Sequence, residues 1–288
     1  MTSASPSKDL YAVAGNPVAH SQSPFIHARF AEQCGQDLAY ERLLCPLDGF
    51  KASIEAFAAQ GGHGCNVTVP FKFEAYALAA RRSERAELAG AVNTLRFDAE
   101  GWWGDNTDGL GLVRDIEHNA ARPLAGLDVL LLGAGGASAG VLGSLVAARP
   151  ARIVLANRTA DKALALQASH AAWATQHQVT LQACALAEVE SKAGQGFDML
   201  INGTSASLSG AGVPVQGRVL KPGALALDMM YGGAAQTFLD WARSQGAQTR
   251  DGLGMLVEQA AEAFFLWRGV RPDTAAVLQA LRERLTPA

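Results

Sequence analysis

The stretch LDVLLLGAGGAS, residues 127–138, decides the fold of the second half of the chain. An apolar run, Val129–Leu132, leads directly into a glycine-rich turn and then into a run of small residues. Glycines at the first and third positions of the turn permit a tight bend and a close approach of the backbone to a pyrophosphate, which the next helix binds with its N-terminal amides. Ser138 replaces the third glycine of the usual pattern. We expect dinucleotide phosphates to bind at Gly133, Ala134, Gly135, Gly136 and Ala137.

The same stretch has a second interpretation, which its composition disfavours. Residues 129–148 carry no charge over a length that could span a membrane. However, these residues include five glycines and two serines, and the glycine turn interrupts them after a short apolar run. A buried strand, a turn and a packed helix explain the stretch better.

The end of the next predicted strand indicates which dinucleotide binds. Residues 152–156 form that strand, and Asn157-Arg158-Thr159 follows it, about 25 residues after the first glycine. A site for NAD usually has a carboxylate there, whereas Arg158, with Lys162 nearby, can pair with the 2'-phosphate of NADP. We therefore expect NADP(H), bound in part by Asn157, Arg158, Thr159 and Lys162. Asp161 leaves NAD open, because this nearby carboxylate could serve the ribose hydroxyls.

Strand and helix signals alternate along the rest of the chain, as in an α/β fold with a parallel sheet covered on both faces. Ser23-Pro24 is typical of a helix start with Ser23 as the N-cap, and Gly35 is typical of its end. Pro70 is expected to open a later helix. The remaining predictions are strands at residues 11–15, 38–45, 65–69, 92–97, 129–132, 199–202 and 224–228, and helices at residues 53–60, 109–119, 253–267 and 274–285.

Composition narrows the classes of partner and cofactor. The 288 residues suffice for two domains, and the net charge of −3 argues against nucleic acid or an anionic membrane as the partner. The four cysteines form no CxxC pair and have no metal-ligand spacing, which favours reduced thiols in a cytoplasmic protein without a metal. No signal-peptide core precedes Leu10. The sequence does not decide between a monomer and a homodimer.

Three polar segments outside the glycine-turn region are candidates for binding a polyhydroxylated small molecule: residues 15–24, 66–72 and 104–109. Lys72 is the most informative residue in them. If Pro70 opens a helix, Lys72 lies in its first turn, where the helix dipole destabilises the ammonium form and favours loss of a proton. That property suits a general acid or base, although an ordinary exposed lysine remains an equal alternative.

A carboxylate is expected to accompany this lysine. Asp105 and Asp108 are both candidates, and spacing alone does not choose between them. His20 and His27 could also carry protons, but His20 is more typical of a turn residue and His27 of a helix-face or core residue.

Seven ordered motifs make the chain similar to the shikimate dehydrogenases over nearly its whole length. They are the Ser21-x-Ser23-Pro24 segment, NVTVPFK at 66–72, AVNT at 91–94, GDNTDG at 104–109, GAGGA at 133–137, NRT at 157–159 and DGLGMLVEQA at 251–260. The resemblance implies reversible reduction of 3-dehydroshikimate to shikimate with NADPH, a step in the biosynthesis of chorismate and the aromatic amino acids.

The resemblance also implies site residues and domain roles. Lys72 and Asp108 would be the catalytic pair, which resolves the choice between Asp105 and Asp108. Residues 1–108 would form an α/β substrate domain to which residues 250–288 return as helices, and residues 109–249 would form a Rossmann-like doubly wound domain for NADP. The substrate, in the cleft between the domains, would contact Ser21, Ser23, Thr68, Asn93, Tyr231 and Gln259. The cofactor would contact Met229, Gly252, Gly254 and Met255, of which Gly254 and Met255 would border the nicotinamide.

Two departures from the family pattern weaken the expected preference for NADP. Lys162 stands where NADP-specific members usually carry a second arginine, and Ala139 stands where some relatives have an arginine. Two rival functions follow: dehydrogenation of quinate or shikimate with NAD or NADP, and a sensor that binds shikimate without turnover. Retention of Lys72 and Asp108 argues against the sensor.

Overall fold

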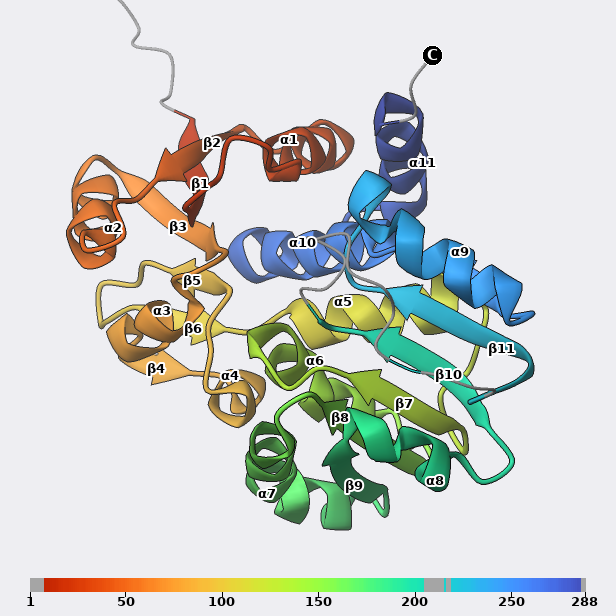
Figure 1. The fold of residues 1–288 in the computed structure, drawn as a ribbon. Coiled ribbons are helices and arrows are strands. Elements are labelled where there is room, and N and C mark those ends of the chain that lie inside the picture. The colour runs from red at the N-terminus through yellow and green to blue at the C-terminus, as the bar shows by residue number, and fades with distance from the viewer. Residues whose placement is uncertain (1–7, 205–214, 216–218, 286–288) are drawn as a thin grey trace, which may run out of the picture. The chain divides into compact units, whose positions relative to one another are not determined.

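The computed structural model describes residues 8–204, 215 and 219–285, which fold as two compact units (Figure 1). Unit 1 combines Met1–Thr107 with Val257–Ala288, and unit 2 consists of Asp108–Leu256. Each unit is built around its own sheet, with strand order β2-β1-β3-β5-β6-β4 in unit 1 and β12-β11-β10-β7-β8-β9 in unit 2.

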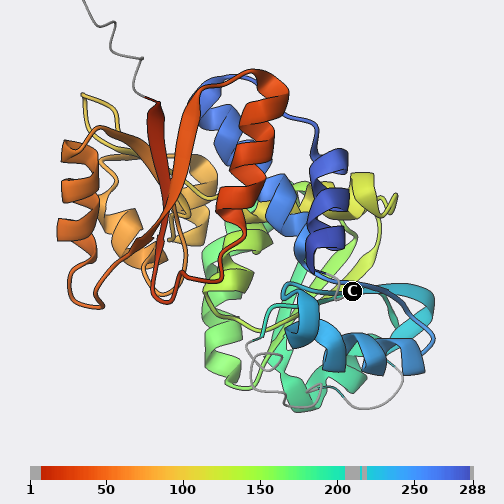
Figure 2. The same cartoon turned by 90° about the horizontal axis from the view of Figure 1, so that it is seen from above.

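The sheet of unit 1 is mixed. Strand β1 pairs in parallel with β2 and β3, whereas β5 runs antiparallel to β3 and β6. Helices α1 and α2 lie on opposite faces of strands β1 to β3 (Figure 2). The elements are β1 (Asp9–Gly15), α1 (Ser23–Cys34), β2 (Leu38–Leu44), α2 (Phe50–Ala59), β3 (Gly62–Val67), α3 (Lys72–Leu78), β4 (Arg81–Arg82), α4 (Glu84–Ala89), β5 (Thr94–Arg96), β6 (Trp103–Asp105) and α11 (Thr274–Leu285).

Helix α1 confirms one predicted boundary and corrects the other. Gly35 ends it in the left-handed conformation, with φ 61°, and its N–H bonds the carbonyls of Ala31 and Glu32. The N-cap is Gln22 rather than Ser23, and no side chain caps the helix. Ser23 cannot act as the cap because it is already the first helical residue and its own amide donates to the Ser21 hydroxyl at 3.3 Å.

Helix α3 begins two residues later than the expected start at Pro70. Residues 68–71 close a turn first, in which the Phe71 N–H donates to the carbonyl of Thr68 at 3.1 Å. The bond from the Ala75 N–H to the Phe71 carbonyl, at 2.8 Å, then starts the helical pattern. Lys72 is therefore the first residue of α3, within the predicted first turn.

The C-terminal segment packs into unit 1 through the end of α10 (Leu253–Arg268). The Trp267 indole Nε1 donates to the carbonyl of Leu95 in β5 at 3.0 Å, across Gly64. A Cβ atom at Gly64 would lie 2.5 Å from that carbonyl oxygen and 2.7 Å from the indole nitrogen. Only glycine fits this close approach of the helix to the sheet.

Every strand pair in the described part of unit 2 is parallel. Numbered within the unit, the strands follow the order 3-2-1-4-5-6, which is the doubly wound Rossmann arrangement and confirms the predicted fold class. Its elements are α5 (Asp108–Arg114), a π-helical turn (Asp115–Asn119), β7 (Asp128–Leu132), α6 (Gly136–Ala147), β8 (Arg152–Asn157), α7 (Ala160–Gln176), β9 (Thr180–Ala185), a short helix (Leu186–Glu188), α8 (Val189–Ala193), β10 (Phe197–Asn202), β11 (Leu220–Asp228), a 3₁₀ turn (Gly232–Ala235), α9 (Gln236–Ser244) and β12 (Gln248–Arg250).

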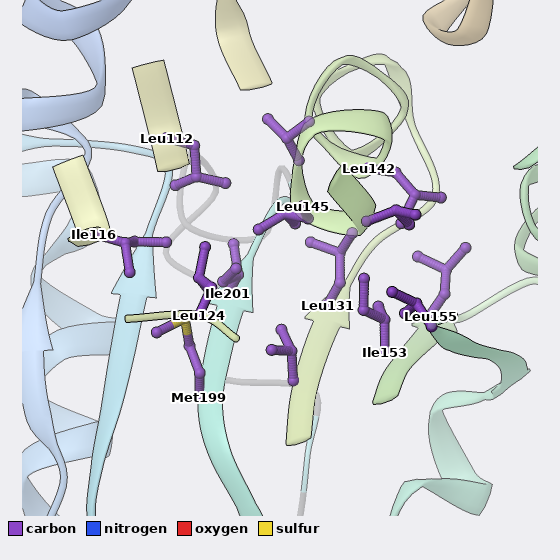
Figure 3. Packing of buried hydrophobic residues seen from close by; sticks show 14 of the residues in the cluster. Leu112, Ile116, Leu124, Leu131, Leu142, Leu145, Ile153, Leu155, Met199 and Ile201 are labelled. Atoms are coloured by element: carbon purple, nitrogen blue, oxygen red, sulfur yellow. The ribbon is translucent and has the colours of Figure 1, made fainter. Parts of the chain in front are cut away.

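The core of unit 2 explains why residues 127–138 dominate the sequence signal. Leu131 in β7 is fully buried among side chains of neighbouring strands and of α5 and α6 (Figure 3). Truncation of such a leucine to alanine typically costs about 2–5 kcal/mol. The apolar strand is therefore central to the sheet, and the glycine turn that follows it is held at a fixed place. Among the described residues, no helix is long and apolar enough to cross a membrane.

Candidate active site

Two serine hydroxyls meet between β1 and α1 in unit 1. Ser21 Oγ lies 3.2 Å from Ser23 Oγ, and Ser23 is buried at the start of α1. The first turn of this 12-residue helix has no acidic residue and no side-chain cap. Hydroxyl donors beside such a helix start suit an anion such as a carboxylate.

A chain of buried side-chain hydrogen bonds runs from β2 to the AVNT segment. The Tyr40 hydroxyl donates to Asn66 Oδ1 at 2.7 Å, and Asn66 Nδ2 donates to the Thr94 hydroxyl at 3.0 Å. The Thr94 hydroxyl in turn donates to Asn93 Oδ1 at 2.9 Å. Burial raises the pKa of Tyr40 well above its ordinary value, so its hydroxyl keeps the proton that it donates.

The same chain continues into the GDNTDG segment and α10. Asn93 Nδ2 donates to the Thr107 hydroxyl at 3.0 Å, and that hydroxyl lies 3.2 Å from Gln259 Oε1. Each donor in this series meets an acceptor, so the network fixes the amide orientations of Asn93 and Gln259. Two predicted substrate ligands from distant parts of the sequence are thus brought together. Of the two residues that support them, Asn66 lies in the candidate segment 66–72, whereas Tyr40 was not predicted.

The two candidate aspartates differ in their surroundings. Asp105 is fully buried in unit 1, where its carboxylate pairs with the Arg85 guanidinium, accepts from the Ser83 hydroxyl and accepts the Asn106 N–H at 2.7 Å. These bonds make Asp105 a structural residue that shapes the loop leading to Asp108. Asp108 is the first residue of α5 in unit 2, with 7% of its surface exposed.

The other candidate residues in unit 1 differ in how far their side chains are exposed to solvent. Lys72 and Thr68 are half-buried, at and just before the start of α3. His20 is exposed, as expected for a turn residue. His27 lies in the core, stacked on Tyr40 with ring centroids 4.1 Å apart. Burial lowers its pKa to about 3, which removes it as a proton carrier near neutral pH.

The glycine turn of unit 2 lies at the point where the strand order reverses, between β7 and β10. Gly133 has a φ of 99°, and an added Cβ would lie 3.0 Å from the carbonyl carbon of Gly203 after β10. An added Cβ at Gly135 would meet nothing within 4 Å, so a ligand can approach the backbone there. Ser138 Oγ, in the first turn of α6, is fully buried and has no hydrogen-bond partner within the described part of the chain. This geometry fits a dinucleotide pyrophosphate.

The end of β8 fits the expected 2'-phosphate site. The Asn157 amide donates to the carbonyl of Thr159 at 2.9 Å and so closes the turn that displays Arg158. Arg158, Thr159 and Lys162 are exposed. The next carboxylate along the sequence is Asp161, which lies in the first turn of α7 rather than at the strand end.

The segment after β12 lies against the carboxyl end of β11, also within unit 2. The Gly252 N–H donates to the carbonyl of Met230 at 2.8 Å, and an added Cβ at Gly252 would lie 2.1 Å from the carbonyl oxygen of Met229. Tyr231 follows β11 and is half-buried, and burial raises the pKa of its hydroxyl. In the described ranges, 8–204, 215 and 219–285, no cluster of three or more His, Cys, Asp or Glu side chains could hold a metal.

Family models match the chain in three stretches. The model of the shikimate dehydrogenase substrate binding domain covers residues 13–95, that of shikimate / quinate 5-dehydrogenase covers residues 115–209, and that of the shikimate 5'-dehydrogenase C-terminal domain covers residues 252–282.

Individual relatives match over almost the full length. A protein of Methylibium petroleiphilum named shikimate dehydrogenase (NADP(+)) is 63% identical over 96% of this chain and 94% of its own. Among solved structures, an Ael1 enzyme from Pseudomonas putida is 47% identical, with a TM-score of 0.88 over 97% of this chain and 99% of that one. A shikimate 5-dehydrogenase of Thermus thermophilus in complex with NADP(H) and shikimate is 32% identical, with a TM-score of 0.83 over 96% of this chain and 100% of that one. The chain belongs to the shikimate dehydrogenase family.

Proposed function

We propose that this chain catalyses the reversible, NADP-dependent reduction of 3-dehydroshikimate to shikimate, in the pathway to chorismate and the aromatic amino acids. The strongest support is the 63% identity, over 96% of the chain, to a relative named shikimate dehydrogenase (NADP(+)). The polar chain from Tyr40 to Gln259 adds a physical reason, since oriented amides and hydroxyls suit a ring that carries several hydroxyls.

The two parts of the chain have separate roles in this proposal. Residues 1–108, with the returning residues 250–288, form the substrate domain, and residues 109–249 form the NADP domain. Tyr231 of the NADP domain also meets the substrate, and Gly252, Gly254 and Met255 of the returning segment also meet the cofactor. Ser21 and Ser23 hold the substrate carboxylate, which the uncapped start of α1 favours. Thr68, Asn93 and Gln259 bind the ring hydroxyls or the carboxylate, and Tyr231 lies near the substrate.

Lys72 and Asp108 carry the chemistry. NADPH, when bound, supplies the hydride that reduces the ketone carbon. Lys72 donates a proton from Nζ to the substrate oxygen on which negative charge develops, and in the reverse direction it accepts that proton from the alcohol. Asp108 accepts a hydrogen bond and orients the reacting groups. Hydroxyl and amide ligands around the ring disfavour a substrate that lacks a matching hydroxyl, because buried polar groups would be left unpaired.

The cofactor is held at three places in unit 2. The backbone of Gly133, Ala134, Gly135, Gly136 and Ala137 binds the pyrophosphate at the start of α6. Arg158, with Asn157, Thr159 and Lys162, binds the 2'-phosphate through charge-assisted hydrogen bonds. Met229, Gly252, Gly254 and Met255 would complete the cofactor site, with Gly254 and Met255 beside the nicotinamide. We further propose a cytoplasmic protein that acts as a monomer or homodimer without a nucleic-acid partner, in keeping with its four free cysteines.

A steady-state assay with shikimate and quinate, each against NADP⁺ and NAD⁺, tests the proposed function. Shikimate with NADP⁺ is expected to give a kcat/KM at least about tenfold above every other pair. NAD⁺ lacks the 2'-phosphate, and quinate brings an additional hydroxyl for which a shikimate site has no partner, and each difference corresponds to about 1.4 kcal/mol or more. Comparable values with quinate or NAD⁺ would assign the broader quinate/shikimate activity. Tight shikimate binding without turnover would assign a sensor.

A further inference from the structure

An arginine that no part of the proposed site includes lies beside the serine pair. Strand β2 pairs with β1 in the register Tyr11↔Tyr40 and Val13↔Arg42. Tyr40 and Arg42 project from the same face of β2, since side chains alternate along a strand. Tyr40 stacks on His27 of α1, so this face of the strand is turned toward α1.

The Arg42 side chain reaches the serine segment. Its guanidinium Nη2 donates to the backbone carbonyl of Ser21 at 2.7 Å. Ser21 Oγ is in turn 3.2 Å from Ser23 Oγ. The positive charge of Arg42 is therefore bonded to the backbone of Ser21, one of the two serines whose hydroxyls hold the substrate carboxylate in the proposed function.

Arg42 differs from Arg81 and Arg82 of the same unit in its electrostatic surroundings. Arg81 pairs with Asp98 at 2.9 Å and Arg82 pairs with Glu87 at 2.6 Å. Within residues 8–204, 215 and 219–285, Arg42 takes part in no ion pair, and its one hydrogen bond uses a neutral carbonyl. No carboxylate of the described chain neutralises the charge that Arg42 brings to the serine pair.

Serine hydroxyls and a guanidinium discriminate between ligands in different ways. A hydroxyl can donate to a carboxylate or to a neutral amide oxygen, so two serines alone select weakly for charge. A guanidinium attracts an anion through its full positive charge. It attracts a neutral group of the same shape much less.

We propose that Arg42 is a specificity-determining residue that selects substrates bearing a negative charge at the Ser21–Ser23 end. The proposal rests on the proposed function, which places a carboxylate there. Arg42 acts by its charge on the anion, and its bond to the Ser21 carbonyl holds the guanidinium beside the serines.

Binding of shikimate and of its neutral isostere shikimamide tests this role without depending on turnover. Titration calorimetry on wild type, Arg42→Gln and Arg42→Lys gives the Kd of both ligands. In Arg42→Gln the Kd of shikimate is expected to rise about tenfold, equivalent to ~1.4 kcal/mol, while that of shikimamide changes less than twofold. Arg42→Lys keeps the charge, so its Kd for shikimate is expected to rise less than threefold.

Arg81→Gln is the matched control, because it removes the same charge from the same unit away from the serines. It is expected to leave both Kd values unchanged. In wild type, the affinity for shikimate is expected to fall between about 20 and 500 mM salt more steeply than in Arg42→Gln, because salt screens an exposed charge.

Three results would overturn the role of Arg42. They are an unchanged Kd of shikimate in Arg42→Gln, equal losses for shikimate and shikimamide, or an Arg42→Lys variant as weak as Arg42→Gln. Equal losses would mean that Arg42 only supports the Ser21 segment. Failure of the proposed function looks different: wild type would bind shikimate in preference to shikimamide but would not oxidise it with NADP⁺.

Discussion

Replacing Gly254 by alanine should destabilise the protein, although helix propensity predicts the opposite. Gly254 lies in the first turn of α10, where alanine is ordinarily favoured over glycine by about 0.5–1 kcal/mol. In this structure an added Cβ would lie 1.7 Å from Asp115 Oδ1. Asp115 is fully buried, and Arg250 holds it with two hydrogen bonds of 2.7 and 2.5 Å. The alanine methyl would displace the carboxylate from that pair.

The size of the effect follows from the burial of the pair. Breaking a buried ion pair typically costs about 3–5 kcal/mol, because a buried charge loses its partner. Subtracting the gain in helix propensity leaves a loss of about 2–4 kcal/mol. For a unit of this size that loss lowers Tm by roughly 5–15 °C.

Urea and thermal unfolding, followed by far-UV circular dichroism on the unliganded protein, measure this loss. Gly233→Ala is the matched control, because an added Cβ there meets nothing within 4 Å. Its stability should stay within about 0.5 kcal/mol of wild type.

A double variant separates the proposed cause from general strain. Asp115→Ala removes the carboxylate that the methyl would strike, so adding Gly254→Ala to it should cost little more. The two changes should therefore be strongly non-additive. A Gly254→Ala protein as stable as wild type, or additive losses in the double variant, would refute the role given to the Asp115–Arg250 pair.

Two further predictions concern cofactor choice and acid stability. Arg158→Ala should weaken NADP⁺ binding about 10- to 100-fold, which is the loss expected for a hydrogen bond to a charged group. The Kd of NAD⁺ should change less than threefold. Equal losses for the two cofactors in a fluorescence titration would show that Arg158 does not bind the 2'-phosphate. Burial lowers the pKa of His27 from its ordinary value of 6.5 to about 3 in the folded protein. As the pH drops below 6.5, His27 therefore takes up a proton in the unfolded chain but not in the folded protein. The free energy of unfolding falls for that reason. Between pH 7.5 and 5.0 this linkage costs about 2 kcal/mol, which His27→Phe should avoid in urea unfolding. Parallel pH dependence of wild type and variant would contradict it.

The parts of the fold that the sequence predicted are those with strong local signals. The apolar run before Gly133 is the central strand β7, and Gly35 ends α1 as expected. The predictions failed where tertiary contacts decide. The edge strand β9 was missed although Leu181 and Ala183 alternate with Thr180 and Gln182, because the run is short and most of its side chains are only half-buried. The predicted helix at residues 109–119 changes to a π-helical turn at Asp115, where the carboxylate bonds Arg250 from a distant segment.

The residues of the candidate site also fall into those that sequence motifs predicted and those that only tertiary contacts reveal. Residues such as Ser21 and Arg158 stand in motifs and could be named from the sequence. Tyr40 could not be named from the sequence, because its role depends on a hydrogen bond from β2 to Asn66 in β3, which only the folded sheet brings together. Gly254 was assigned to the nicotinamide from resemblance, and only the structure reveals that its missing side chain makes room for a buried ion pair.

The most direct test of the proposed chemistry is the behaviour of Lys72→Ala, measured as kcat for shikimate oxidation with NADP⁺ beside the Kd of shikimate from calorimetry. If Lys72 handles the proton, kcat should fall about 100-fold or more while the Kd changes only a few-fold. A kcat that holds while the Kd or KM rises would reduce Lys72 to a binding residue and contradict the account.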